Sequence, residues 1–313
     1  MDSDYFYEAF DKSHYSKFNE LYQNAFKKFM SFDNFCKRFN TKTRGFEFIG
    51  FIAVHRLTGK PAAFYGVFPL KILMGNLKLL AAVSGDTMTH SKHRKKGLFV
   101  TLAKMTYEKC KISGIHMIYG FPNNQSYHGL VNSLGWSHVN DLIEWNLSFR
   151  FKISPIHKII KYIPSLRPLF NAYAFRLLKK YIVSNITSFN NHQSKKYSVV
   201  CRDLDYISYK DSEECIFIQI ENVIVWIRLS TFLWVGDFSD LEQVNNSVMS
   251  QLKRLARLLG YNTIRFHINQ EIVLPTAMRE FKVGKSIPTC ILYLGNEKPN
   301  SEFLFTPADF DTW

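Results

Sequence analysis

The order of strand and helix patterns in the first half of the chain limits the folds it can adopt. After an N-terminal helix pattern, three apolar stretches separated by turn residues are typical of antiparallel strands. Helix and strand patterns then alternate, which indicates a strand–helix–strand crossover. The predicted strands span residues 48–57, 62–72, 79–89, 115–121 and 136–149, and the predicted helices span residues 13–30, 97–113 and 126–134. These elements predict an α/β domain with a mixed sheet.

The last third of the chain repeats this plan with one part missing. Strands are predicted over 199–202, 215–221, 223–229, 232–238, 262–268 and 290–294, and helices over 244–259 and 275–281. The spacing from Asp86 to Gly114 is 28 residues, whereas the corresponding spacing from Asp237 to Gly260 is 23. The extra length holds a basic turn, and the second copy has the acidic stretch 239–242 instead. We therefore expect a phosphate-binding turn in the first copy and a structural role for Asp237.

The basic charge of the chain is concentrated in its middle. Lys and Arg number 40 against 26 Asp and Glu, which gives a net charge of +14. The segment from Trp145 to Arg202 contains eleven of these cations and no acidic residue, and Pro164 and Pro168 predict two short helices within it. We interpret it as a solvated helical connector. A contact with an anionic membrane surface through residues 150–182 is the alternative, and nucleic acid is not favoured because no base-reading motif is present.

Cysteine usage and the N-terminus indicate the compartment. The five cysteines are an odd number and form no C-x-x-C pair, which argues against a disulfide framework and against a zinc site. The first residues are acidic and lack the apolar stretch of a signal peptide. We expect a cytoplasmic protein, with a peripheral position at the inner face of the membrane as the variant that the basic segment allows.

A basic turn, Arg94-Lys95-Lys96-Gly97, lies between a predicted strand and the helix that Leu98 begins. A helix N-terminus exposes unpaired N–H groups and the positive end of the helix dipole. Gly97 lets the backbone approach phosphate oxygens closely, and the cations beside it add charge-assisted hydrogen bonds. The turn matches neither the Walker pattern nor G-x-G-x-x-G. It therefore predicts a pyrophosphate site of another type.

Three segments in order resemble the GNAT superfamily of N-acyltransferases. Residues 89–99 resemble its acyl-CoA loop, whose pattern is Q/R-x-x-G-x-G/A. Residues 119–127 resemble its fifth strand and the start of the next helix, and Leu134-Gly135-Trp136 resembles its Leu-Gly-Phe ending. The resemblance covers residues 4–149. It implies a GNAT fold with a second, degenerate GNAT-like lobe, acetyl-CoA or another acyl-CoA as co-substrate, and no metal.

The resemblance also implies which residues bind the co-substrate. Backbone groups of Met88 and Thr89, together with Asn124, would hold the pantetheine arm. The residues expected at the pyrophosphate are Arg94, Lys95, Lys96, Gly97, Leu98, Phe99 and Val100. Phe99 stands where the family has Gly or Ala, so its ring must point into the core.

Acyl transfer needs a base for the amine and an acid for the departing thiolate. Asp86, on the central strand, is the favoured base, and His90 and His93 are the alternatives. Tyr127 is the candidate acid, because Val131 occupies the position where the family commonly has a tyrosine.

These patterns predict three parts: a GNAT acyl-CoA-binding domain over residues 1–150, a basic helical connector over 151–196 and a degenerate GNAT-like domain over 197–313. The resemblance implies an acyl-CoA-dependent N-acyltransferase whose acceptor is a small-molecule primary amine. Its subgroup suggests an amino sugar of surface-polysaccharide synthesis, nucleotide- or lipid-linked. Two alternatives are an aminoacyl-tRNA-dependent transferase of the peptidoglycan-bridge type and a non-catalytic CoA-binding module.

Overall fold

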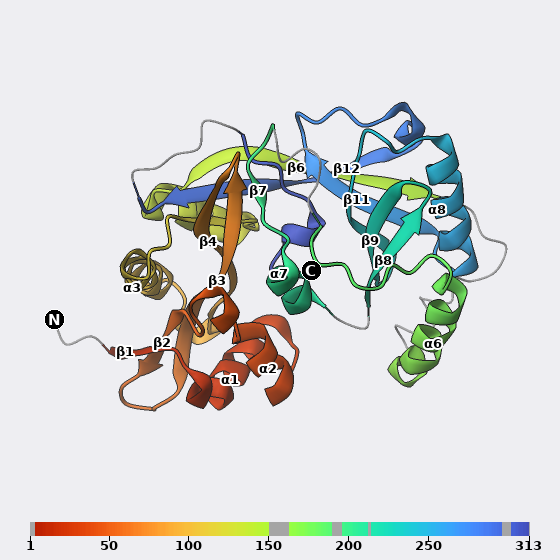
Figure 1. Cartoon of the computed structure of the whole chain (residues 1–313). Coiled ribbons are helices and arrows are strands. Elements are labelled where there is room, and N and C mark those ends of the chain that lie inside the picture. Colours follow the sequence, from red (N-terminus) through yellow and green to blue (C-terminus); the bar gives the residue numbers. More distant parts are fainter. Residues whose placement is uncertain (1–3, 150–162, 190–195, 212–213, 296–301, 313) are drawn as a thin grey trace. The chain divides into compact units, whose positions relative to one another are not determined.

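The chain divides into two compact units. The computed structural model describes residues 4–149, 163–189, 196–211, 214–295 and 302–312 (Figure 1). Unit 1 comprises the described parts of Met1–Val139 and Pro288–Asn300, and unit 2 those of Asn140–Ile287 and Ser301–Asp311. Strands β6 (Ser137–Ser148) and β12 (Lys282–Tyr293) contribute residues to both units.

Unit 1 is built on a mixed sheet in the order β1-β2-β3-β4-β5-β12. Its antiparallel strands are β1 (Tyr5–Ala9), β2 (Gly50–His55), β3 (Pro61–Met74) and β4 (Leu77–Thr89). Strand β4 then pairs in parallel with β5 (Met117–Gly120), and Cys290–Tyr293 of β12 pair antiparallel with β5. The mixed α/β fold expected from the sequence is confirmed, and β1 is an edge strand that the sequence pattern did not predict.

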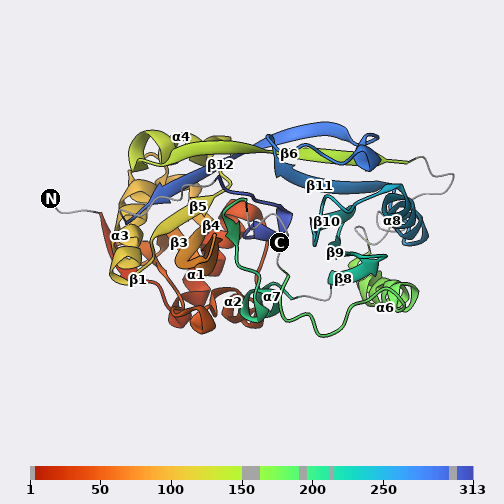
Figure 2. The ribbon, with the colours of Figure 1, turned by 45° about the horizontal axis from the view of Figure 1, so that its top comes forward.

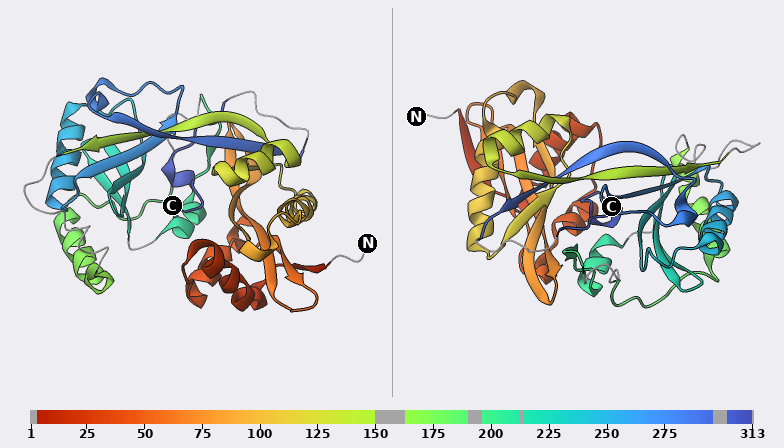
Figure 3. Two further views of the ribbon diagram at one scale, coloured as in Figure 1. Left: turned by 180° about the vertical axis from the view of Figure 1, so that it is seen from behind. Right: turned by 90° about the horizontal axis from the view of Figure 1, so that it is seen from above.

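Helices cover both faces of the unit 1 sheet (Figure 3). One face carries α1 (Tyr15–Phe26) and α2 (Phe32–Phe39), and the other carries α3 (Leu98–Ile112) and α4 (Asn124–His128). Successive residues of β3 point to opposite faces, so Phe64 packs among phenylalanines of the α1–α2 face while Tyr65 packs against α3. This two-sided packing explains why the first ten residues of β3 are all buried.

Short helical turns complete unit 1. They are η1 (Lys12–His14), η2 (Lys42–Arg44), η3 (Ser91–His93) and the π-helical turn η4 (Gly129–Ser133). The single helix predicted over 126–134 is therefore two pieces, α4 and η4. Asn123 begins the first piece, because its side chain accepts hydrogen bonds from the backbone N–H groups of Gln125 and Ser126.

Unit 2 has strands in the order β6-β11-β10-β9-β8, with β10 and β11 parallel (Figure 2). Its further strands are β7 (Val199–Val200), β8 (Cys215–Ile220), β9 (Val223–Leu229), β10 (Leu233–Phe238) and β11 (Thr263–Asn269). Its helices and turns are η5 (Pro164–Leu166), α6 (Arg167–Leu178), α7 (Leu204–Lys210), α8 (Asn246–Leu258), η7 (Thr276–Met278) and η8 (Pro307–Asp309).

Several elements differ from the sequence-based expectation. Helix α7 and turn η8 were not predicted, and β12 starts at Lys282 rather than at Cys290. The strand predicted over 199–202 is only two residues long. Residues 151–162 and 190–195 of the predicted connector lie outside the described residues. Within the described ranges no helix is long and apolar enough to cross a bilayer.

The two units repeat one internal plan. In unit 1 the β3–β4 register shifts between Gly85 and Met88, and in unit 2 the β9–β10 register shifts between Val235 and Asp237. Each bulge therefore falls at a Gly-Asp pair. Helices α3 and α8 then end in the same way, at Gly114 and Gly260, whose φ angles are 71° and 79°. The repeat expected from the sequence has a structural counterpart at both its bulge and its helix end.

Candidate functional site

The ends of β4 and β5 separate. The two strands pair only where Ala81–Val83 meet Met117–Tyr119, although β4 continues to Thr89. At the bulge, Asp86 and Thr87 lie opposite the single residue Tyr65, since Gly85 pairs with Gly66 and Met88 with Phe64. The last residues of β4, including Met88 and Thr89, are thus outside the β5 ladder.

The basic turn after β4 is exposed. Arg94, Lys95, Lys96 and Gly97 are all solvent-accessible. Lys95 and Gly97 have φ angles of 61° and 75°, so the chain reverses through two left-handed residues before α3 begins. Gly97 is the N-cap residue and supplies no side-chain cap to the first turn of α3, whose first N–H groups have no carbonyl partner within the helix.

Space around Gly97 suits a ligand. A β-carbon built on this glycine would meet no atom within 4 Å. The positive end of the α3 dipole and three exposed cations lie at the same point. Backbone donors, positive charge and open space are what a pyrophosphate requires, so the turn fits the diphosphate of an acyl-CoA.

Phe99 points into the core, as the expected site requires. The centroid of its ring lies 5.5 Å from the centroid of the Tyr65 ring. A β-carbon added to Gly129 would lie 3.0 Å from Cε1 of Phe99. Leu98 is buried and Val100 packs against the same core. These three residues therefore anchor the first turn of α3 through their side chains.

Asp86 forms an ion pair that the sequence did not suggest. Its carboxylate accepts from Nε of Arg38, on α2, and the exposed fraction of its side chain is 8%. The guanidinium lies over the ring of Phe68, 4.8 Å from its centroid. Asp86 also has a φ of 52°, an uncommon conformation for a residue other than Gly, which fits its place in the bulge. No local signal could have revealed Arg38, because 48 positions separate the two residues.

Tyr127 and Asn124 lie on α4. The Tyr127 hydroxyl is 3.1 Å from Nδ1 of His138, and the two rings meet edge to face. Val131 packs against the core of unit 1 and offers no polar group in place of a tyrosine. Asn124 is exposed at the first residue of the helix. The structure thus adds His138 as a partner of the candidate acid.

The two histidines before the basic turn have different surroundings. Nδ1 of His90 accepts a hydrogen bond from the backbone N–H of Lys92 and caps η3. Nδ1 of His93 is 2.8 Å from the hydroxyl of Tyr5, on β1. Burial, and after it the neighbouring His55 and His90, lower the pKa of His93 below its usual value. His93 is therefore mostly neutral near pH 7 and chemically able to accept a proton.

A buried hydrogen-bond chain supports the bulge from the α3 side. Ser84 Oγ donates to the Tyr65 hydroxyl at 3.1 Å, this hydroxyl is 3.0 Å from that of Tyr107, and Trp136 Nε1 donates to Tyr107 at 2.8 Å. Burial raises the pKa of Tyr65 to about 12 and also raises that of Tyr107. Both stay protonated at neutral pH and fix β3, β4 and α3 together.

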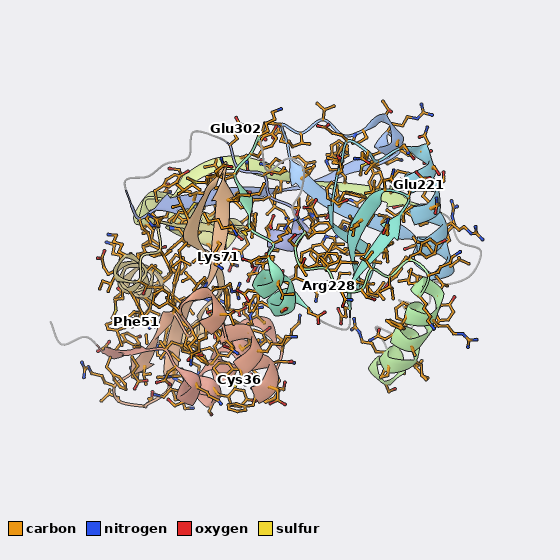
Figure 4. All side chains as sticks on the ribbon, in the orientation of Figure 1. Cys36, Phe51, Lys71, Glu221, Arg228 and Glu302 are labelled. Carbon is orange, nitrogen blue, oxygen red and sulfur yellow. The ribbon has the colours of Figure 1, made fainter. Side chains whose placement is uncertain are left out.

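In unit 2, side chains of the protein occupy the positions that correspond to the basic turn and to the Asp86 bulge of unit 1. Asn245 caps α8 through hydrogen bonds from the N–H groups of Ser247 and Val248. The carboxylate of Glu221, which is labelled in Figure 4, accepts from the Asn245 and Ser247 side chains. A carboxylate thus lies at the end of α8 that corresponds to the basic turn before α3.

Asp237, the aspartate at the bulge of unit 2, is buried. Nη1 of Arg202 donates to the carboxylate of Asp237. Nη2 of Arg202 donates to both carboxylate oxygens of Asp309, at 2.8 and 2.9 Å. All three side chains are at most 4% exposed. Asn269 holds the same C-terminal segment through Phe303 and Phe305.

Comparison with known proteins agrees with this geometry. Residues 7–139 match the family model described as acetyltransferase (GNAT) domain. No curated protein matches the sequence. The solved structures of similar fold include a GCN5-related N-acetyltransferase from Kribbella flavida, with a TM-score of 0.58 and 9% identity over 92% of this chain and 70% of the other. A second is a GCN5-related N-acetyltransferase from Anabaena variabilis ATCC 29413, with a TM-score of 0.56 and 10% identity over 93% of this chain and 73% of the other.

The family match covers the β4–turn–α3 site, and the likeness of fold extends over both units. Residues 7–139 are therefore similar in sequence to a GNAT acetyltransferase domain.

Proposed function

We propose that the protein transfers an acetyl or similar acyl group from acyl-CoA to the primary amine of a small molecule. The observation that carries this proposal is the exposed turn at Gly97, where open space, three cations and the N-terminus of α3 coincide beside the separated ends of β4 and β5. These features suit a ligand with a diphosphate at one end and a narrow arm at the other.

The residues that would hold acyl-CoA follow from this arrangement. The diphosphate would lie against the backbone of residues 97–100, with Arg94, Lys95 and Lys96 around it. The pantetheine arm would lie along the backbone of Met88 and Thr89, near Asn124. Acyl-CoA supplies the acyl group as a thioester, and the amine of the acceptor displaces the thiolate.

The protein must move two protons in this reaction. As the C–N bond forms and the C–S bond breaks, the amine loses one proton and the thiolate gains one. We propose Asp86 as the acceptor of the first proton, with its carboxylate oriented by Arg38. His90 and His93 are the alternatives. Tyr127, with His138 behind it, is proposed as the donor of the second proton.

We propose an amino sugar, nucleotide- or lipid-linked, as the acceptor. The support for this choice is the resemblance of residues 119–123 and 134–136 to the GNAT subgroup of surface-polysaccharide synthesis.

The test has two stages. Isothermal titration with acetyl-CoA is expected to show binding, while an RNA oligonucleotide at the same concentration is expected to give none. Release of CoA thiol is then measured with a panel of acceptors that includes free amino sugars, nucleotide-linked amino sugars, polyamines and amino acids. Turnover with an amine supports the proposal. Binding without turnover across the panel would identify a CoA-binding module, and RNA binding without CoA binding would point to the tRNA-dependent class.

A further inference from the structure

Helix α6 carries large apolar side chains that face solvent. The exposed fraction is 69% for Leu169, 57% for Phe175, 44% for Tyr173 and 36% for Leu166. Leu166, Leu169 and Tyr173 follow each other at helical spacing and so form one stripe. Leu258, at the end of the neighbouring α8, is 47% exposed and lies next to Tyr173, whose hydroxyl donates to its carbonyl oxygen at 2.8 Å. A cluster of this kind marks an interaction surface.

The other side of α6 holds the helix in unit 2. Phe170, Ala174 and Leu178 are buried. Arg167 forms an ion pair of 2.6 Å with Glu214, which also accepts from Nε of Arg228 on β9 (Figure 4). The stripe is therefore presented by an anchored helix, and its two leucines are not among these anchoring residues.

Positive charge accompanies the stripe. Arg176, Lys179 and Lys180 are exposed at the C-terminal end of α6, and no acidic residue occurs between Trp145 and Arg202. This charge would repel a second copy of the same surface, which argues against self-association. Leucine side chains can neither stack on bases nor pair with phosphates, which argues against nucleic acid. Leucines with flanking aromatic residues and cations match the boundary between anionic headgroups and acyl chains.

We propose that the α6 surface, defined as Leu166, Leu169, Tyr173 and Phe175 with Arg176, Lys179 and Lys180, binds the protein peripherally to a bilayer that contains anionic lipid. The leucines and the phenylalanine enter the interface, and the cations contact the headgroups. This inference does not depend on the acyltransferase proposal, because it rests on unit 2 alone.

Co-sedimentation with vesicles tests the proposal. Vesicles with about 30% phosphatidylglycerol in phosphatidylcholine are expected to retain the protein, and pure phosphatidylcholine to retain much less, because each cation near an anionic surface strengthens binding about fivefold. Raising the salt concentration from about 0.1 M to about 1 M should release most of it.

Two variants separate the apolar and the charged contributions. Leu166→Ser with Leu169→Ser should weaken vesicle binding at least about tenfold, since burial of one leucine is worth more than a factor of ten. Its matched control is Leu57→Ser, an exposed leucine of unit 1. Lys179→Gln with Lys180→Gln should remove the preference for anionic vesicles, and Lys282→Gln with Lys285→Gln, two exposed lysines of β12, serves as the control.

The outcomes are distinct. Retention that depends on anionic lipid and falls in both α6 variants but in neither control supports the proposal. Equal retention by both vesicle types, no retention at all, or unchanged retention in the α6 variants overturns it. Binding of a fluorescent RNA in place of vesicles would assign the surface to nucleic acid and also overturn it.

Discussion

At the scale of single residues, a substitution of Asp86 tests whether its carboxylate accepts the proton of the amine. Asp86→Asn removes the proton acceptor but keeps the side chain's size, so kcat should fall at least about a hundredfold while the affinity for acetyl-CoA stays near that of the wild type. Steady-state rates and isothermal titration measure the two quantities. Arg38→Gln is the matched control, because it breaks the same ion pair from the other side. Equal losses of kcat in the two variants would show that Asp86 serves only as a partner for Arg38.

His267 should make the stability of unit 2 depend on pH. It lies buried on β11, and desolvation lowers its pKa to about 4, against the opposite influence of Glu144. The contact of 3.7 Å between His267 and Glu144 is therefore not an ion pair at neutral pH. Because the folded state favours the neutral ring, its contribution to stability is complete above the unfolded-state pKa near 6.5 and is lost as the pH falls toward 4.

Thermal unfolding between about pH 7 and pH 4 measures this effect, whose upper limit is roughly 3 kcal/mol. His267→Phe should flatten the dependence, since the ring already packs near Trp234 and Phe310 and the replacement cannot be protonated. His128→Gln, an exposed histidine of α4, should leave the dependence as in the wild type. An unchanged slope in the His267 variant would contradict the assignment.

At the scale of elements, the N-terminus of α3 can be tested against its own C-terminus. Gly97 and Gly114 flank this helix, both have φ above 70°, and an added β-carbon would meet no atom within 4 Å at either one. Gly97→Glu and Gly114→Glu therefore carry similar backbone strain and the same charge. Gly97→Glu should abolish acetyl-CoA binding by placing a carboxylate at the phosphates, whereas Gly114→Glu should bind within about threefold of the wild type. Equal affinities in the two variants would remove the turn from the site.

An element can be predicted from the sequence when the residues that determine it lie close together in the chain. The extent of α3 and the exposed turn before it follow from residues 94–112 alone, and the structure agrees with the prediction. The first half of β12 has no alternating apolar pattern, because its residues contact Glu144 and Asn146 around Gly284 rather than a core. Its register comes from partners distant in sequence. Arg38 and His138 were missed for the same reason, since each reaches a site residue only through the fold.

At the scale of the whole molecule, the repeat and its asymmetry could be expected from the sequence, but the cause of the asymmetry could not. The acidic stretch 239–242 pointed to a lost phosphate site. In the structure the Asn245 cap and Glu221 lie at the N-terminal end of α8, and the C-terminal segment places Asp309 on Arg202. Glu221 and Asp309 are 24 and 72 positions from Asn245 and Asp237, so no local pattern identifies them.

This asymmetry predicts that each chain binds about one acyl-CoA, because a helix N-terminus accepts a phosphate only when its N–H groups and its positive potential are unshared. Isothermal titration of the wild type with CoA should give a stoichiometry near one, and Gly97→Glu should bring it near zero. Glu221→Gln removes the carboxylate from α8 but leaves the Asn245 cap and the Arg202–Asp309 contact, so this variant should still bind about one equivalent. A wild-type stoichiometry near two, or a full equivalent retained by Gly97→Glu, would place a functional site in unit 2 and refute the view that its own side chains replace the ligand.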